Sequence, residues 1–184
     1  ITSKLSSFFS QTLFICTFYT QKHCFYAISH RFCVPSHKDR RKVKNMNPID
    51  IALRIATTAH AGQLDRDGNP VILHPLTVGL MGHTDEEKMV GFLHDVVEDT
   101  PYTFEDLLKE GIPAGVVNAL RLLTHKKGTD YYDYVQDIIR SGNPIALRVK
   151  YNDLQHNFAR GKAYPDLQKK HGKALEMIKS AIEE

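Results

Sequence analysis

One six-residue segment, His94 to Asp99, concentrates side chains that bind cations and move protons. It reads His-Asp-Val-Val-Glu-Asp. On a helix, His94 and Glu98 lie four residues apart and share a face, as do Asp95 and Asp99. Apolar residues before and within the segment place part of that face against a core, and buried carboxylates are costly unless a cation neutralises them. The segment therefore indicates a site for a divalent cation, and the alternative is a solvated acidic helix end.

Two residues elsewhere in the chain are of types that suit the same site. His74 precedes a proline where a helix is expected to begin, and Asp153 shares a helix face with Asn157. Taken alone, His74 fits a structural or capping histidine, and Asp153 fits an ordinary polar helix surface. Their occurrence together with the segment 94–99 is what favours a functional interpretation.

The elements that must position these side chains are expected to be helices. Apolar residues recur at helical spacing through most of residues 49–182, and no convincing alternating strand pattern occurs. A loop over 62–70 is marked by Asp67-Gly68-Asn69-Pro70. The sequence predicts an all-α fold with helices over about 49–59, 74–82, 84–97, 103–111, 113–123, 130–140, 144–158 and 165–182.

Composition divides the chain into two unlike parts. The 184 residues permit one domain with a tail, and no apolar run is long enough to span a membrane. Residues 1–45 hold eight basic residues and one acidic residue, a net charge of +7, so the remainder of the +3 chain carries −4. All three cysteines also lie in residues 1–45. The acidic balance of 46–184 argues against nucleic-acid binding, and its lack of cysteine is compatible with a reducing cytoplasm.

The folded domain is expected to begin near the first methionine, Met46. A helix start follows it at once, with Asn47 as the N-cap and Pro48 at the first helical position. We therefore predict a domain over 46–184 and interpret residues 1–45 as a leader from upstream translation or an incomplete gene model. An organelle transit peptide is an alternative, because the leader is rich in serine and basic residues; a secretory signal is a weaker one.

Three motifs in order resemble the HD-domain phosphohydrolase superfamily, and specifically the hydrolase domain of the RelA/SpoT alarmone enzymes. They lie at 59–75, 92–100 and 149–157, within a resemblance that covers 49–182. The resemblance implies an HD-domain helical bundle of about seven or eight helices, in a small stand-alone hydrolase. It implies a divalent metal ion, Mn²⁺ in the family, although the donors also suit other first-row metals. The metal ligands that it implies are His74, His94, Asp95 and Asp153.

The resemblance also assigns the reaction and the remaining site residues. Glu98 and Asp99 match the pair that orients and deprotonates the attacking water. Asn157 matches a residue that contacts the substrate, and Lys150 and Arg66 are further candidates for substrate binding; a solvated helix lysine is the alternative for Lys150. The expected reaction is hydrolysis of the 3′-pyrophosphate of the nucleotide ppGpp or pppGpp, giving GDP or GTP and pyrophosphate.

The sequence departs from the family where the base is recognised. The family has a basic pair before the Gly-x-Pro segment, and an arginine of that pair packs against guanine. Here Asp65 occupies the first basic position, only Arg66 remains, and Val71 replaces the usual tyrosine. Two alternatives therefore stay open: an HD phosphohydrolase that acts on another nucleotide or phosphoester, and a non-catalytic nucleotide-binding module.

Overall fold

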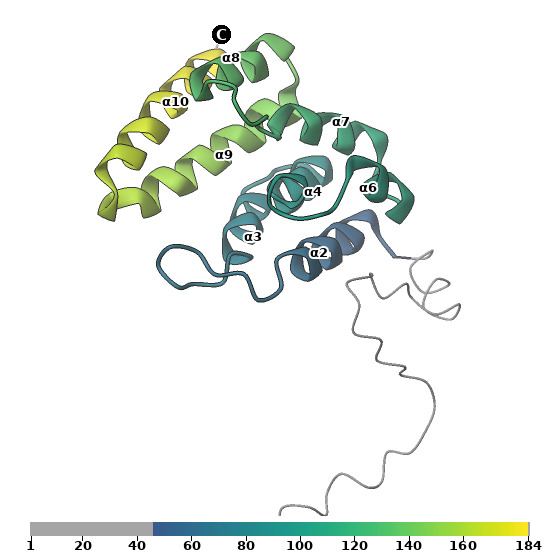
Figure 1. Cartoon of the computed structure of the whole chain (residues 1–184). Helices are drawn as coiled ribbons and strands as arrows, with labels where there is room; N and C mark the ends of the chain where they lie inside the picture. Colours follow the sequence, from purple (N-terminus) through teal and green to yellow (C-terminus); the bar gives the residue numbers. More distant parts are fainter. Residues whose placement is uncertain (1–45, 184) are drawn as a thin grey trace, which may run out of the picture. The chain divides into compact units, whose positions relative to one another are not determined.

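The computed structural model describes residues 46–183, which form a helical bundle (Figure 1). The described residues contain no strand, so the all-α prediction is confirmed. The predicted leader, 1–45, lies outside them. The helices are α2 (Pro48–Ala59), α3 (Leu73–Leu80), α4 (Asp85–Leu93), α5 (Val96–Asp99), α6 (Phe104–Glu110), α7 (Ala114–Leu123), α8 (Tyr131–Ser141), α9 (Pro144–Arg160) and α10 (Pro165–Glu183), with a 3-10 turn η1 (Gly161–Ala163) between the last two.

Side-chain caps begin the helices where the sequence predicts them. The Asn47 side chain accepts the N–H of Ile49, and proline follows at the first helical position of α2. Thr84 and Glu87 form a reciprocal capping box at the start of α4. Thr103 begins α6 in the same way. These caps satisfy N–H groups that have no partner within the helix, so local sequence sets where each helix starts.

Helix α4 is the centre of the bundle and packs against α2, α3, α7 and α9 (Figure 1). α9 also packs along α10, and the turn η1 joins the two. The core between these helices is largely aliphatic, and Phe92 and Tyr134 are also buried in it. Its largest fully buried apolar side chains are Ile55, Leu93, Leu107, Leu120, Ile138, Leu154 and Ile178. No helix in the described part of the chain is long and apolar enough to cross a membrane.

One predicted element is wrong: the helix expected over 84–97 is interrupted at His94 and Asp95. α4 ends at Leu93 and the short α5 begins at Val96. The His94 side chain supplies the reason, because its Nδ1 bonds the carbonyl of Gly91 at 2.8 Å. In a continuous helix that carbonyl would accept the N–H of residue 95, so the imidazole competes with the helical ladder. The break places His94 and Asp95 in a turn at the end of α4.

Two glycines set how closely α3 and α4 approach each other. A Cβ added to Gly91 would lie 2.6 Å from Cα and 2.7 Å from the backbone N of Gly79. A Cβ added to Gly79 would lie 2.2 Å from the Phe92 ring. Glycine within a helix costs about 0.5–1 kcal/mol relative to alanine. Here that cost is offset by a backbone contact that larger residues would prevent, and this contact brings the end of α4 beside α3.

We predict that Gly91→Ala destabilises the domain strongly. The new Cβ meets backbone rather than a movable side chain, so the free energy of unfolding should fall by about 3 kcal/mol in urea titrations. Gly115→Ala is the matched control, because a Cβ at Gly115, in the first turn of α7, has no atom within 4 Å. The control should unfold at an unchanged or slightly higher urea concentration. Equal stability of Gly91→Ala and the unmodified chain would contradict the close contact of α3 and α4.

Candidate metal centre

Four side chains from three parts of the chain converge beside the break after α4. His74 comes from the first turn of α3, His94 and Asp95 from the turn between α4 and α5, and Asp153 from the middle of α9. The Nε2 atoms of the two histidines are 3.3 Å apart. Asp153 Oδ1 lies 3.0 Å from Nε2 of His74 and 3.7 Å from Nε2 of His94. Asp95 is the fourth member: its Oδ1 lies 3.1 Å from Nε2 of His94, and its Oδ2 lies 3.7 Å from Nε2 of His74.

The spacing and chemistry of these donors fit a divalent metal ion. Ligand atoms about 2.1 Å from one ion lie about 3.0 Å apart at a right angle and about 3.4 Å apart at a tetrahedral angle. The observed separations, 3.0 to 3.7 Å, surround these values. His74, His94 and Asp153 are buried, while the Asp95 side chain is 26% exposed and faces the cavity. Two imidazoles and two carboxylates suit a first-row divalent ion.

Contacts behind the histidines orient their rings. The bond from His94 Nδ1 to the Gly91 carbonyl places a proton on Nδ1, so Nε2 is the ring nitrogen that faces the other candidate ligands. His74 Nδ1 lies 2.7 Å from Nδ1 of His156, and the two rings stack at an angle of 10°. The sequence analysis did not single out His156. Its position three residues after Asp153 on α9 was the available signal, because residues three apart share a helix face.

Asp153 is buried, and two side chains of its own helix hold it. Lys150 Nζ donates to Oδ2 at 2.9 Å, and Asn157 Nδ2 donates to Oδ1 at 2.5 Å. Lys150 is itself buried and lies near the faces of Tyr134 and Tyr131. Lys150 is therefore not the solvated lysine that its helix position also allowed. Its ammonium group compensates the Asp153 carboxylate and sets the direction of that carboxylate.

Electrostatics in the centre favour a cation among the four side chains. Burial alone would lower the pKa of His94, but the nearby carboxylates of Asp95 and Asp153 outweigh it and raise the pKa to about 9. Burial would likewise raise the pKa of Asp153, but Lys150 and the two imidazoles hold it well below its usual value. The Asp153 carboxylate thus stays charged and attracts positive charge, which either a proton on the neighbouring imidazoles or a metal ion can supply.

Glu98 and Asp99 are the last two residues of α5, the short helix that follows Asp95. Glu98 Oε2 accepts the backbone N–H of His125 at 3.0 Å. Burial raises the pKa of the Glu98 carboxyl, and that hydrogen bond opposes the increase. Burial, and then the charge of Asp95, raise the pKa of Asp99. A carboxylate with a raised pKa is a stronger proton acceptor, which is the property that a general base near neutral pH needs.

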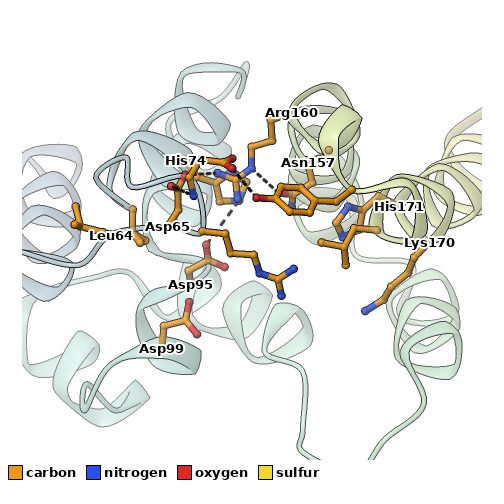
Figure 2. Close-up of a pocket in the computed structure, with 15 residues that line it drawn as sticks. Leu64, Asp65, His74, Asp95, Asp99, Asn157, Arg160, Lys170 and His171 are labelled. Atoms are coloured by element: carbon orange, nitrogen blue, oxygen red, sulfur yellow. Dashed lines mark hydrogen bonds and ion pairs between the residues drawn. The ribbon is translucent and has the colours of Figure 1, made fainter.

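Two adjoining pockets, here called the larger and the smaller lobe, lie beside the four side chains; all four line the smaller lobe, and His74 and Asp95 also line the larger. The larger lobe, about 490 Å³, extends toward the loop 62–70 and includes Asp99. The smaller, about 250 Å³, extends toward Glu98, His125, Tyr131 and Lys150. Figure 2 shows Asp95 and Asp99 on one side of the larger lobe and Lys170 and His171 of α10 on another. The lobes share His74, Asp95, Asn157, Arg160, Lys170 and His171.

The structure brings together most of the side chains predicted from the sequence. His74, Asp95 and Asn157 line both lobes, while His94, Glu98, Lys150 and Asp153 line the smaller lobe. Arg66 lines the larger lobe from the exposed part of the loop. The sequence analysis did not single out Arg160, Tyr164, Lys170 or His171. These come from the end of α9, from the residue before α10 and from α10 itself, outside the three sequence motifs.

The sequence of this chain is similar to parts of several curated proteins. No family model matches the chain. A guanosine-3′,5′-bis(diphosphate) 3′-pyrophosphohydrolase of Haemophilus influenzae is 48% identical over 66 residues, 34% of this chain and 10% of that protein. A GTP pyrophosphokinase of Streptomyces coelicolor is 29% identical over 147 residues, 74% of this chain and 17% of that protein. The chain thus spans less than a fifth of the length of these curated relatives.

A solved structure matches the fold over most of the described bundle. It is that of a metazoan ortholog of SpoT that hydrolyses ppGpp, with a TM-score of 0.61 and 20% sequence identity, and the match covers 74% of this chain and 85% of that one. At this identity the likeness concerns the fold, while the curated relatives supply the sequence similarity. Together they confirm that the chain resembles a RelA/SpoT-type hydrolase domain.

Proposed function

We propose that this chain is a metal-dependent hydrolase that removes the 3′-pyrophosphate from ppGpp or pppGpp. The observation that carries the proposal is the convergence of His74, His94 and Asp153, with an Asp95 oxygen 3.1 Å from His94 Nε2, beside pockets that Glu98 and Asp99 also line. The Haemophilus influenzae relative carries the name of this activity, and the structural neighbour is described as a ppGpp hydrolase. Both similarities support the same reaction at the same kind of site.

Mn²⁺ is the ion that we propose for the centre, held by the two imidazoles and two carboxylates. Such an ion lowers the pKa of a coordinated water and neutralises charge on the phosphate. Hydrogen bonds within the chain hold the candidate ligands in fixed orientations. Lys150 and Asn157 fix the direction of the Asp153 carboxylate, and the Gly91 carbonyl fixes the tautomer of His94. The donor atoms therefore need little rearrangement to bind a cation.

Proton transfer is the role that we propose for Glu98 and Asp99. One of these carboxylates accepts the proton of the water that attacks phosphorus, and the bond between that phosphorus and the 3′ oxygen breaks, so that pyrophosphate leaves. Because each carboxyl group has a raised pKa, either can hold the proton and then return it to the departing 3′ oxygen. His125 positions Glu98 through its backbone N–H.

A second candidate function is the hydrolysis of another nucleotide or phosphoester at the same centre. Asp65 favours it, because a carboxylate stands on the wall of the larger lobe where the family has a basic residue. A non-catalytic nucleotide-binding module is the third. Several relatives are named for GTP pyrophosphokinase activity rather than for hydrolysis, which also makes a direct assay necessary.

The deciding experiment is an assay of the full chain with Mn²⁺ on ppGpp and on a panel of other nucleotides. We expect release of pyrophosphate and GDP from ppGpp at a higher kcat/KM than from the other nucleotides. Faster hydrolysis of another substrate would favour the second candidate. Binding of nucleotide with no turnover of any substrate would favour the binding module.

Metal binding can be tested separately from turnover with Asp95→Asn. The substitution keeps size and removes the charge of a partly exposed ligand, so the affinity for Mn²⁺ in calorimetric titrations should fall by at least about tenfold. Asp137→Asn, at an exposed carboxylate on α8 that pairs with Arg140, is the control and should bind Mn²⁺ as the unmodified chain does. Equal Mn²⁺ affinity of Asp95→Asn and the control would remove Asp95 from the ligand set.

The roles of Glu98 and Asp99 predict a loss of kcat without a loss of metal. Glu98→Gln and Asp99→Asn keep size but cannot accept a proton, so each should reduce kcat by about 10²–10⁴-fold while Mn²⁺ affinity is retained. The double variant should lose less than the product of the two losses, since both groups act on one water. Glu86→Gln, at an exposed position in the first turn of α4, is the control. A normal kcat for one single variant would assign the proton transfer to the other residue.

A further inference from the structure

His156 is a half-buried histidine of α9 that has no role in the reaction proposed above. It lies three residues after Asp153 and next to Asn157, yet it lines neither lobe of the cavity. Its Nδ1 atom lies 2.7 Å from Nδ1 of His74, the candidate ligand on α3. A residue that contacts a ligand from outside the cavity can act on the metal centre through that ligand alone.

The contact between the two Nδ1 atoms is a hydrogen bond that holds one proton. Two protonated nitrogens at this distance would repel each other, and so would two lone pairs, so one ring donates and the other accepts. The planes of the two rings differ by only 10°. In this alignment the N–H in the plane of one ring can point at the lone pair in the plane of the other. The contact therefore restrains the plane of the His74 ring as well as one of its nitrogen atoms.

Metal binding decides which of the two rings donates. Nε2 of His74 lies 3.3 Å from Nε2 of His94 and 3.0 Å from Oδ1 of Asp153, so Nε2 is the nitrogen that faces the other candidate ligands. A ring nitrogen that coordinates a metal has no proton, so His74 must then carry its proton on Nδ1. His74 therefore donates, and His156 accepts with the lone pair of its own Nδ1.

Without an acceptor at Nδ1, a second tautomer of His74 would compete with metal binding. The His74 side chain is buried, and a buried N–H without a partner is costly. The ring avoids this cost when its proton moves to Nε2, because Asp153 Oδ1 accepts a proton from that side. A proton on Nε2 occupies the position that the metal needs. An acceptor on His156 favours the other tautomer and so reduces this competition.

The two candidate histidine ligands differ in the kind of acceptor that they use. Nδ1 of His94 bonds the backbone carbonyl of Gly91, which is present whatever the side chain. Nδ1 of His74 bonds a side chain from α9, the helix that also carries Asp153. Acceptors of both kinds hold a ligand histidine in one tautomer and one orientation. Only the acceptor of His74 can be removed by substitution, so its role can be tested.

We propose that His156 is a positioning residue for the metal centre: it accepts the Nδ1–H of His74 and so keeps Nε2 of His74 free to bind a divalent cation. The inference rests on the metal centre of the proposed function and adds to it a residue from outside the cavity. Because this role precedes substrate binding, its effect is measurable as metal affinity in the absence of nucleotide.

The test compares His156→Phe and His156→Asn with His83→Phe in the full chain. Phenylalanine keeps a ring but has no acceptor, whereas asparagine places its Oδ1 where Nδ1 stood and can accept the same bond. His83 is exposed just before α4 and is the control. In calorimetric titrations with Mn²⁺ alone, affinity should fall by about tenfold or more in His156→Phe and stay within about threefold of normal in His156→Asn. His83→Phe should bind Mn²⁺ as the unmodified chain does.

Turnover distinguishes positioning of the metal ligand from a part in the reaction itself. With ppGpp as substrate, His156→Phe should need about tenfold more Mn²⁺ for half-maximal activity, while kcat at saturating Mn²⁺ stays within about threefold of normal. A loss of packing alone would affect both variants at position 156, because asparagine is smaller than either ring. Restoration of Mn²⁺ affinity by asparagine therefore reports the acceptor.

Nitrogen-15 NMR of the unmodified chain tests the tautomers without any substitution. With Zn²⁺ bound as a diamagnetic ion, Nδ1 of His74 should carry a proton and Nδ1 of His156 should not. A scalar coupling between the two Nδ1 atoms, transmitted across the hydrogen bond, should identify the pair. This measurement still decides the proposal if His156→Phe fails to fold.

Four results would overturn the assignment: no Mn²⁺ binding by the unmodified chain, equal affinities of His156→Phe and His83→Phe, equal losses in the two variants at position 156, or a proton on Nδ1 of His156 rather than of His74. Failure of the proposed function gives a different pattern. The chain would then bind Mn²⁺ in a manner that depends on the acceptor at position 156, and yet it would not hydrolyse ppGpp.

Discussion

The buried carboxylate of Asp153 is the constraint on which the rest of the site depends. A charge in the middle of a core helix must be compensated, and uncompensated burial would cost several kcal/mol. Lys150 supplies one compensating charge from the preceding turn of α9, and the imidazole of His74 contacts the other oxygen. Negative charge that these two contacts leave uncompensated lies in the space between Asp153, His94 and Asp95. A metal ion fits in this space. Lys150 must itself be buried to do this, and the rings of Tyr131 and Tyr134 cover it.

Backbone geometry delivers the other half of the centre. Gly79 and Gly91 let α3 and α4 touch along their backbones, so His74 and His94 reach a separation of 3.3 Å from separate helices. The break after Leu93 then turns Asp95 toward the same point. Both features involve Gly91, whose missing Cβ admits α3 and whose carbonyl holds the His94 ring. A single small residue therefore couples helix packing to the orientation of a candidate metal ligand.

Much of the bundle could be predicted from the sequence because its signals are local. Capping residues such as Asn47 and Thr84, and the helical spacing of apolar residues, act within one or two turns, and the helices begin where these signals stand. The candidate metal ligands were identified because they lie in ordered motifs. The break at His94 was not predicted, because it depends on a side chain that takes a carbonyl from its own helix. Tyr164 and Arg160 were missed for a different reason: their contacts with Asp67 and Asp65 join segments almost a hundred residues apart.

The candidate metal ligands and proton acceptors lie on packed helices, whereas a wall of the larger lobe is formed by the loop 62–70. The groups proposed for hydrolysis lie on α3, α5, α9 and the turn after α4, where core packing fixes them. Two polar contacts on the wall of the larger lobe hold the loop 62–70 to Arg160 and Tyr164, the residues on either side of η1. Changes in the loop can therefore alter the wall of the larger lobe without moving the candidate metal ligands. Asp65 is such a change: it reverses the charge at one position of the loop, while an arginine from α9 provides the positive charge on the opposite wall.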